Sequence, residues 1–132
     1  MTGAGGLKIP TERQVQRSIL AMCGRLFPDV WITHIPNGAH FAGTDCQRAM
    51  QMGALKGDGL KVGTPDLLCL WAKGGGALME VKRAKGSKIS PEQEALHDKL
   101  HALGWPVGIV HSADQAHAYL VASGAPCIGK LA

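Results

Sequence analysis

Two acidic residues and a lysine are spaced along the chain so that they could meet on one side of a β-hairpin. Asp66 follows Pro65, and after thirteen further residues Glu80 and Lys82 flank a valine. Because successive side chains of a strand point to opposite faces, these three residues project from the same face. Two carboxylates suit a divalent cation such as Mg²⁺ or Mn²⁺, and the lysine can hold a phosphate oxygen or orient a water. The pattern indicates phosphodiester hydrolysis, with a surface ion-pair cluster as the alternative.

Two short apolar segments, 67–71 and 77–79, flank the glycine run 74–76 and are predicted to pair as that hairpin. With the turn centred on Gly74, Asp66 faces Lys82. A register shift of two residues preserves the arrangement, whereas a shift of one moves the acids to the other face. The opposite face is apolar and is predicted to pack on the core; it comprises Leu67, Cys69, Trp71, Ala77, Met79 and Val81.

A helix is predicted over 12–27, because Thr11 and Gln14 form a capping box at its start. Glu12 lies one turn before Val15 and therefore on the inward-facing stripe of this helix. Two interpretations are open for Glu12. It could favour the helix N-terminus electrostatically, or it could join the other two acids in the site. The apolar stripe comprises Val15, Ile19, Met22 and Leu26.

The segments between this helix and the hairpin are predicted to form a strand and a second helix. Residues 30–35 are rich in β-branched and aromatic residues and end at the turn sequence 36–38. Thr44 could cap a helix that runs to about Lys56. Its buried side is predicted to comprise Cys46, Ala49, Met50 and Gly53.

A third helix begins at Ser90, which is followed by proline and then by glutamine at the third helical position. It ends at Gly104. Gln93 lies three residues before Leu96 and is predicted to point toward the sheet with the apolar stripe. That stripe comprises Leu96, Leu100 and Leu103.

The rest of the chain completes an α/β fold. A strand is predicted over 105–110, and Ser112 caps a last helix over 113–121. The strand–helix–strand unit from Glu80 to Val110 is a crossover, which requires parallel pairing and a right-handed connection. We therefore expect a small mixed β-sheet flanked by helices, in the order α-β-α-β-β-α-β-α.

Composition places the chain among soluble globular proteins. Its 132 residues suit a single domain over 11–132, after a flexible N-terminal segment over 1–10. No apolar run approaches the roughly 20 residues that span a bilayer. The four cysteines are scattered without a CxxC pair, which favours reduced thiols in a cytoplasm over a zinc site. His97 and His101 have a zinc-compatible spacing, but the glutamate of HExxH is missing, and both are predicted instead to be solvent-exposed on the polar side of the helix.

The net charge of +4 is concentrated after the acidic residues, where four basic residues fall within seven positions. Such a run is either a solvated loop or an edge that binds phosphates by steering and counterion release. Beside the carboxylate pair, the second interpretation is favoured. The residues are Lys82, Arg83, Lys85 and Lys88.

These motifs resemble a known family. Pro65-Asp66 with Glu80-Val81-Lys82 matches the PD-(D/E)XK motif of the restriction-endonuclease-like nucleases. The sequence around this motif is similar to the VRR-NUC branch of that superfamily, with the motif segments in the right order over about 11–121. The small size resembles the stand-alone members of bacteria and their phages. The motif segments are Glu12, the sequence at 34–38, the sequence at 63–67, the sequence at 80–82, the sequence at 90–93, and Gly104.

The resemblance implies roles for individual residues. Asp66 and Glu80 would bind Mg²⁺ or Mn²⁺ together with the Val81 carbonyl, and Lys82 would position or activate the water. Glu12 would be an auxiliary acid, and Gln93 would support the site from its helix. Outside this set, the basic residues Arg83, Lys85 and Lys88 are the candidate contacts to DNA.

The resemblance also implies a metal-dependent DNA endonuclease that favours branched or Holliday-junction substrates, often as a homodimer. Its setting would be the cytoplasm of a bacterial or phage-infected cell. Two alternatives stay open: a nuclease of linear duplex or single-stranded DNA ends, and a nucleic-acid-binding module without catalysis. The complete set of Asp66, Glu80 and Lys82 argues against the last, because a binding module would be free to lose the lysine.

Overall fold

A computed structural model describes residues 8–36 and 41–129. Most of the predicted flexible N-terminal segment, and part of the predicted turn at 36–38, lie outside these residues. The chain folds in the predicted order of elements. These are α1 (Glu12–Leu26), β1 (Trp31–His34), α2 (Asp45–Gly57), β2 (Leu67–Trp71), β3 (Gly75–Val81), α3 (Pro91–Ala102), β4 (Val107–Val110) and α4 (Ala113–Ala122).

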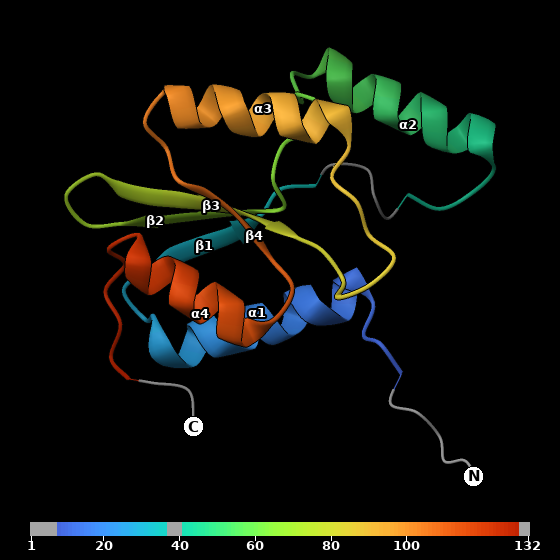
Figure 1. The fold of residues 1–132 in the computed structure, drawn as a ribbon. Coiled ribbons are helices and arrows are strands. Elements are labelled where there is room, and N and C mark those ends of the chain that lie inside the picture. Colours follow the sequence, from blue (N-terminus) through green and yellow to red (C-terminus); the bar gives the residue numbers. More distant parts are fainter. Residues whose placement is uncertain (1–7, 37–40, 130–132) are drawn as a thin grey trace, which may run out of the picture.

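The four strands form one mixed sheet in the order β1-β2-β3-β4. The first three strands are antiparallel, and β4 pairs parallel to β3 after the α3 crossover, as predicted. Helices α1 and α4 lie side by side on one face of the sheet, and α3 lies on the other (Figure 1). The α/β class predicted from the sequence is therefore confirmed.

The hydrophobic core lies between the sheet and the helix pair α1 and α4. The hairpin contributes its predicted apolar face, and α1 contributes Val15, Ile19 and Met22. α3 covers the other face less completely, since Leu70 and Ile109 remain 38% and 44% exposed. No described helix is long and apolar enough to cross a membrane.

The predicted turn of the hairpin is displaced by one residue, and this shifts the register by two. Leu67 pairs with Met79 and Trp71 with Gly75, so the loop is 72–74 and is centred on Lys73. The second and third glycines of the run belong to β3 rather than to the turn. Gly75 is needed there because a Cβ would collide with the Trp71 indole, and a Cβ at Gly76 would lie tightly against Trp105 and Leu70. The shift is an even number of residues, so the predicted faces are unchanged.

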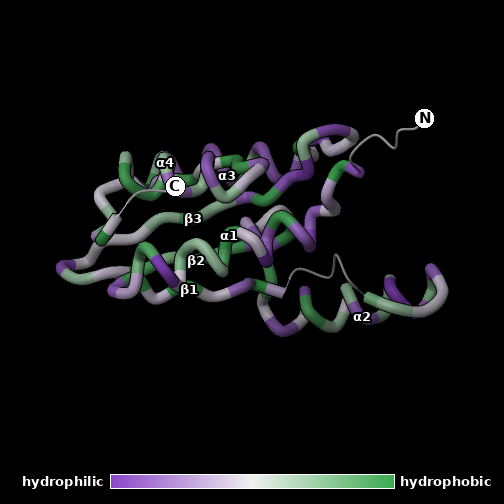
Figure 2. Tube along the Cα trace, turned by 90° about the horizontal axis from the view of Figure 1, so that it is seen from below, coloured by the Kyte–Doolittle hydropathy of each residue, from purple (hydrophilic) through white to green (hydrophobic). Residues whose placement is uncertain are grey.

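Helix α2 differs from the prediction in what it buries. Its capping box at Thr44 and Gln47 is present, but the helix has no buried residue. The four residues predicted for a buried side are exposed; they are Cys46, Ala49, Met50 and Gly53. Both views place α2 at the periphery, apart from the sheet, with hydrophobic and hydrophilic residues intermixed along it (Figure 2). Periodicity predicted the helix, but the neighbour that would bury its stripe is missing from the described residues.

Candidate active site

The junction of β2 and β3 brings the two predicted acids together. The observed register continues to place Asp66 opposite Glu80, and their carboxyl groups are joined by a hydrogen bond. Asp66 Oδ2 also accepts the backbone N–H of Val81 at 2.8 Å. Asp66 is 9% exposed and Glu80 is 1% exposed. The site is therefore built around a buried pair of acids.

Burial raises the pKa of Glu80 from its ordinary 4.5 to about 9. The hydrogen bond that Glu80 donates to Asp66, the charge of Asp66 and the charge of Glu12 act in the same direction, while Lys82 opposes them. Glu80 therefore holds its proton at neutral pH. Two neighbouring carboxyl groups cannot both ionise, because their negative charges repel each other. A bound cation would relieve this repulsion.

Lys82 and Glu12 complete the charged cluster that the sequence indicated. Lys82 Nζ lies 3.9 Å from Glu80 Oε2, and the lysine side chain is only 11% exposed. Glu12 is the first residue of α1, placed there by the Thr11–Gln14 capping box. Its Oε2 accepts a hydrogen bond from the Ser87 hydroxyl at 3.3 Å. Glu12 thus opens the helix, and its charge also acts on Glu80, while its membership of the catalytic site stays a prediction.

The structure gives Gln93 a local role. Its Oε1 accepts the Ser90 backbone N–H at 2.9 Å, and its own backbone N–H is bound by the Ser90 hydroxyl, which together form a capping box. Gly63 lies against this turn with a positive φ of 88°, and a Cβ there would come within 2.5 Å of the Glu92 carbonyl oxygen. The loop that leads to Asp66 therefore packs directly on the start of α3. Support of the acids by Gln93 remains a prediction.

The basic residues are divided between the site and the surface. Lys82 belongs to the buried cluster, Arg83 is partly buried, and Lys85 and Lys88 are exposed. The start of the loop is anchored by His111, whose Nδ1 lies 3.2 Å from the carbonyl oxygens of Lys82 and Arg83. The exposed part of the loop thus begins at a strand end that is held in place beside the acids.

His97 was predicted to be exposed, and this prediction is wrong. The residue is 6% exposed, and its Nε2 lies 3.5 Å from Glu80 Oε1. The sequence did contain a signal for it: His97 lies four residues after Gln93, one helical turn along the side predicted to face the sheet. His101 is exposed, as predicted, and its ring lies against the backbone of Val107.

The donor set fits a hard divalent cation that keeps part of its water shell. Two steps beyond the Leu67–Met79 pair, Pro65 stands opposite Val81. Because proline has no N–H, it cannot donate to the Val81 carbonyl, and Pro65 therefore does not compete for the predicted third oxygen ligand. Glu80 Oε1 is buried without a hydrogen-bond partner among the described residues. Within those same residues, no three His, Cys, Asp or Glu side chains form a complete metal-binding group.

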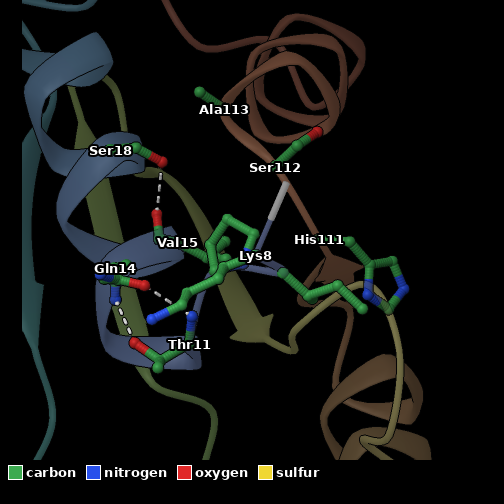
Figure 3. Close-up of a pocket in the computed structure, with 10 residues that line it drawn as sticks. Lys8, Thr11, Gln14, Val15, Ser18, His111, Ser112 and Ala113 are labelled. Carbon is green, nitrogen blue, oxygen red and sulfur yellow. Dashed lines mark hydrogen bonds between the residues drawn. The ribbon is translucent and has the colours of Figure 1, made fainter. Parts of the chain in front are cut away.

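A separate pocket lies beside this cluster, between the starts of α1 and α4 (Figure 3). Its volume is about 600 Å³, and its lining includes Lys8, Thr11, His111 and Ser112. The Thr11 hydroxyl faces Gln14 in the capping box and is already hydrogen-bonded (Figure 3). Among the described residues, no carboxylate lines this pocket, which distinguishes it from the neighbouring cluster of acids and lysine.

Comparison with known proteins identifies the family of the chain. The family model described as the VRR-NUC domain matches residues 12–114. A solved structure titled "VRR_NUC domain protein" has a TM-score of 0.65 at 24% identity, covering 86% of this chain and 88% of that chain. Another, titled "VRR_NUC domain", has a TM-score of 0.56 at 20% identity, covering 86% and 97%.

The curated proteins contain no match to this chain. The two structural likenesses establish the fold, and the family model spans the helix that carries Glu12, the hairpin and the crossover helix. The matched range thus includes both acids, Lys82 and His97. The chain therefore belongs to the VRR-NUC family, a nuclease domain family of the PD-(D/E)XK type.

Proposed function

We propose that this nuclease is a DNA endonuclease that depends on Mg²⁺ or Mn²⁺, held by Asp66, Glu80 and the Val81 carbonyl oxygen. The observation that carries the proposal is the buried, hydrogen-bonded pair of acids with a pKa of about 9 at Glu80. A buried pair that shares a proton is unfavourable to ionise alone but becomes favourable when a cation replaces that proton. When bound, the cation would supply positive charge to the phosphate as negative charge develops during hydrolysis.

The side chains of the protein would prepare the reaction around that charge. The Val81 N–H fixes Asp66 Oδ2, so this carboxylate has a defined orientation before any ligand arrives. The Lys82 ammonium, which lies near Glu80 Oε2, would hold a phosphate oxygen or orient the attacking water. Glu12 would act as an auxiliary acid from the start of α1, and Gln93 would support the site from α3.

DNA binding would use the basic loop that begins at Lys82. Arg83, Lys85 and Lys88 follow the site without a break, and the last two are exposed. Contacts from these residues to backbone phosphates would place a phosphodiester over the acids and would weaken with salt. They carry no base specificity of their own.

A preference for branched or Holliday-junction DNA is the finer part of the proposal, and it follows the resemblance to stand-alone VRR-NUC members of bacteria and phages. Cutting a junction symmetrically requires two active sites, which favours a homodimer in the cytoplasm of the host cell. α2 supports this proposal as the contact surface, because its Met50 is 71% exposed and the helix has no buried residue.

The test is a cleavage assay on labelled four-way junction, linear duplex and single-stranded DNA, each with Mg²⁺, Mn²⁺ or EDTA. We expect cleavage that requires a metal and is fastest on the junction. Equal rates on junction and duplex would overturn the branched preference, leaving a nuclease of linear DNA. If DNA is bound but none is cut under any metal, the protein is a binding module and the proposed function fails.

A further inference from the structure

The side chains of His97 and Lys82 lie near different carboxyl oxygens of Glu80. Lys82 Nζ faces Glu80 Oε2 at 3.9 Å, whereas His97 Nε2 faces Glu80 Oε1 at 3.5 Å. Both Oε1 and Nε2 are buried and have no hydrogen-bond partner among the described residues. Two buried polar atoms that lack hydrogen-bond partners are costly unless they interact with each other. An interaction between the two atoms would offset the free-energy cost of burying them.

The imidazole of His97 can supply the interaction that Glu80 Oε1 lacks, because its Nε2 is 3.5 Å away. A neutral imidazole carries one N–H, which can be placed on Nε2. The separation of 3.5 Å is at the outer limit of a hydrogen bond, and such bonds in active sites are often long before ligands bind and then shorten.

We propose that His97 is a positioning residue for Glu80: its Nε2–H donates to Oε1, fixes the rotation of the carboxylate, and leaves Oε2 to face the cation and Lys82. The inference rests on the proposed function, because it assigns a partner to one of the proposed metal ligands. Carboxylates that bind metals are commonly oriented by such hydrogen bonds, and loss of the partner typically weakens metal binding 10–100-fold.

The position of His97 is rigidly defined, as this role requires. α3 starts at the capping box of Ser90 and Gln93, and Gly63 packs its backbone on that first turn. His97 lies one turn further along the same helix and contacts the sheet at Glu80. Rotation of the helix is thus restricted at its start, so the histidine is held where a donor is needed.

The experiment measures Mn²⁺ affinity directly, from the electron paramagnetic resonance signal of free Mn²⁺, in the DNA-free protein. His97→Leu removes the donor but keeps an apolar side chain of similar size. His97→Gln retains an N–H that can reach the place of Nε2. His101→Leu, one turn away and exposed, is the matched control. We expect affinity to fall roughly 10–100-fold in His97→Leu, and to stay within about threefold of the wild type in His97→Gln and His101→Leu.

Thermal unfolding of each variant separates folding from positioning. If His97→Leu does not fold, His97→Gln still decides, because affinity near the wild-type value supports a donor role. Wild-type affinity in a folded His97→Leu, or equal losses in folded His97→Leu and His97→Gln, would overturn the inference. A wild-type protein that neither binds Mn²⁺ nor cuts DNA would instead refute the proposed function, which keeps the two failures distinct.

Discussion

Neighbouring residues of β3 are equally buried on its two faces, yet one face is apolar and the other carries charge. Met79 is 0% exposed and packs against the helix pair α1 and α4, while Glu80 is 1% exposed and faces Asp66, Lys82 and His97. Burial of Met79 stabilises the fold by removing apolar surface from water. Burial of Glu80 costs free energy, which its polar neighbours offset only in part. Two adjacent residues that are equally buried therefore have opposite effects on the stability of the fold.

The largest effect is expected from Asp66→Asn on the polar face. The amide keeps the size of the side chain and an oxygen that can accept the Val81 N–H, but it removes the negative charge that would bind the cation. We expect the cleavage rate to fall at least about a hundred-fold, with DNA affinity and melting temperature nearly unchanged. Single-turnover cleavage and fluorescence anisotropy measure the two quantities. A rate within tenfold of the wild type would remove Asp66 from the catalytic site.

Met79→Ala tests the apolar face. Loss of this fully buried side chain leaves a cavity in the core, and we expect a loss of about 2–5 kcal/mol in the free energy of unfolding. Urea denaturation measures it. The cleavage rate per folded molecule should stay close to the wild-type value, provided that the assay is run well below the melting temperature.

Leu70→Ala is the matched control for that experiment, because Leu70 lies in the adjacent strand but is 38% exposed. Its cost should be less than half that of Met79→Ala. A folded Met79→Ala protein that has lost cleavage would show that the two faces of β3 are not independent.

Glu80→Gln is expected to stabilise the metal-free protein at alkaline pH. In the wild type the folded protein holds a proton on Glu80 up to about pH 9, whereas the unfolded chain releases it near 4.5. The stability of the folded wild type is therefore highest, as far as Glu80 is concerned, below pH 4.5, and it decreases as the pH rises toward 9. Glutamine cannot ionise, so the variant should melt a few degrees higher than the wild type at pH 8 in EDTA, with a smaller difference at pH 5.

Addition of Mn²⁺ should reverse the order at pH 8, since only the wild type retains the ligand. The measurement is the melting temperature at pH 5 and pH 8, in EDTA and in Mn²⁺. A difference between the two proteins that does not change with pH would mean that Glu80 is ionised in the metal-free fold.

The smallest effect is expected from Lys85→Ala and Lys88→Ala at the edge of the site. Each change removes one exposed charge, and we expect DNA affinity to fall by a few-fold at low salt and the salt dependence to decrease by about one phosphate contact. Lys73→Asn is the control, because Lys73 lies in the hairpin turn at the other end of the strands and has a positive φ that asparagine tolerates. Equal losses in the control would mean that only net charge matters.

Much of the fold could be predicted because its signals are local. Capping boxes at Thr11, Thr44 and Ser90 define where three helices begin, and each is present in the structure. The alternation of apolar and polar residues in the hairpin gave the correct faces, although the turn was placed one residue too late. That error came from tertiary contact: the Trp71 ring requires Gly75 within the strand.

The parts that could not be predicted depend on which elements meet. The stripe on α2 indicated a buried side, but burial requires a neighbour, and a helical period carries no information about one. His97 was assigned to the exposed side of α3 because histidine is polar, although its spacing from Gln93 placed it toward the sheet. In both cases the helical period was recognised correctly, but whether the residue is buried depends on which elements pack against the helix.

The close approach of Gly63 to the first turn of α3 makes the active site vulnerable at a residue with no chemistry of its own. The segment that carries Asp66 and the helix that carries His97 meet there through backbone atoms, with no side chain to adjust. Any larger residue would push the two apart and disturb both sides of Glu80 together. A genetic selection for inactive but soluble variants should therefore recover Gly63 beside the acids, and grafts of this site onto another scaffold would have to transfer both segments as one unit.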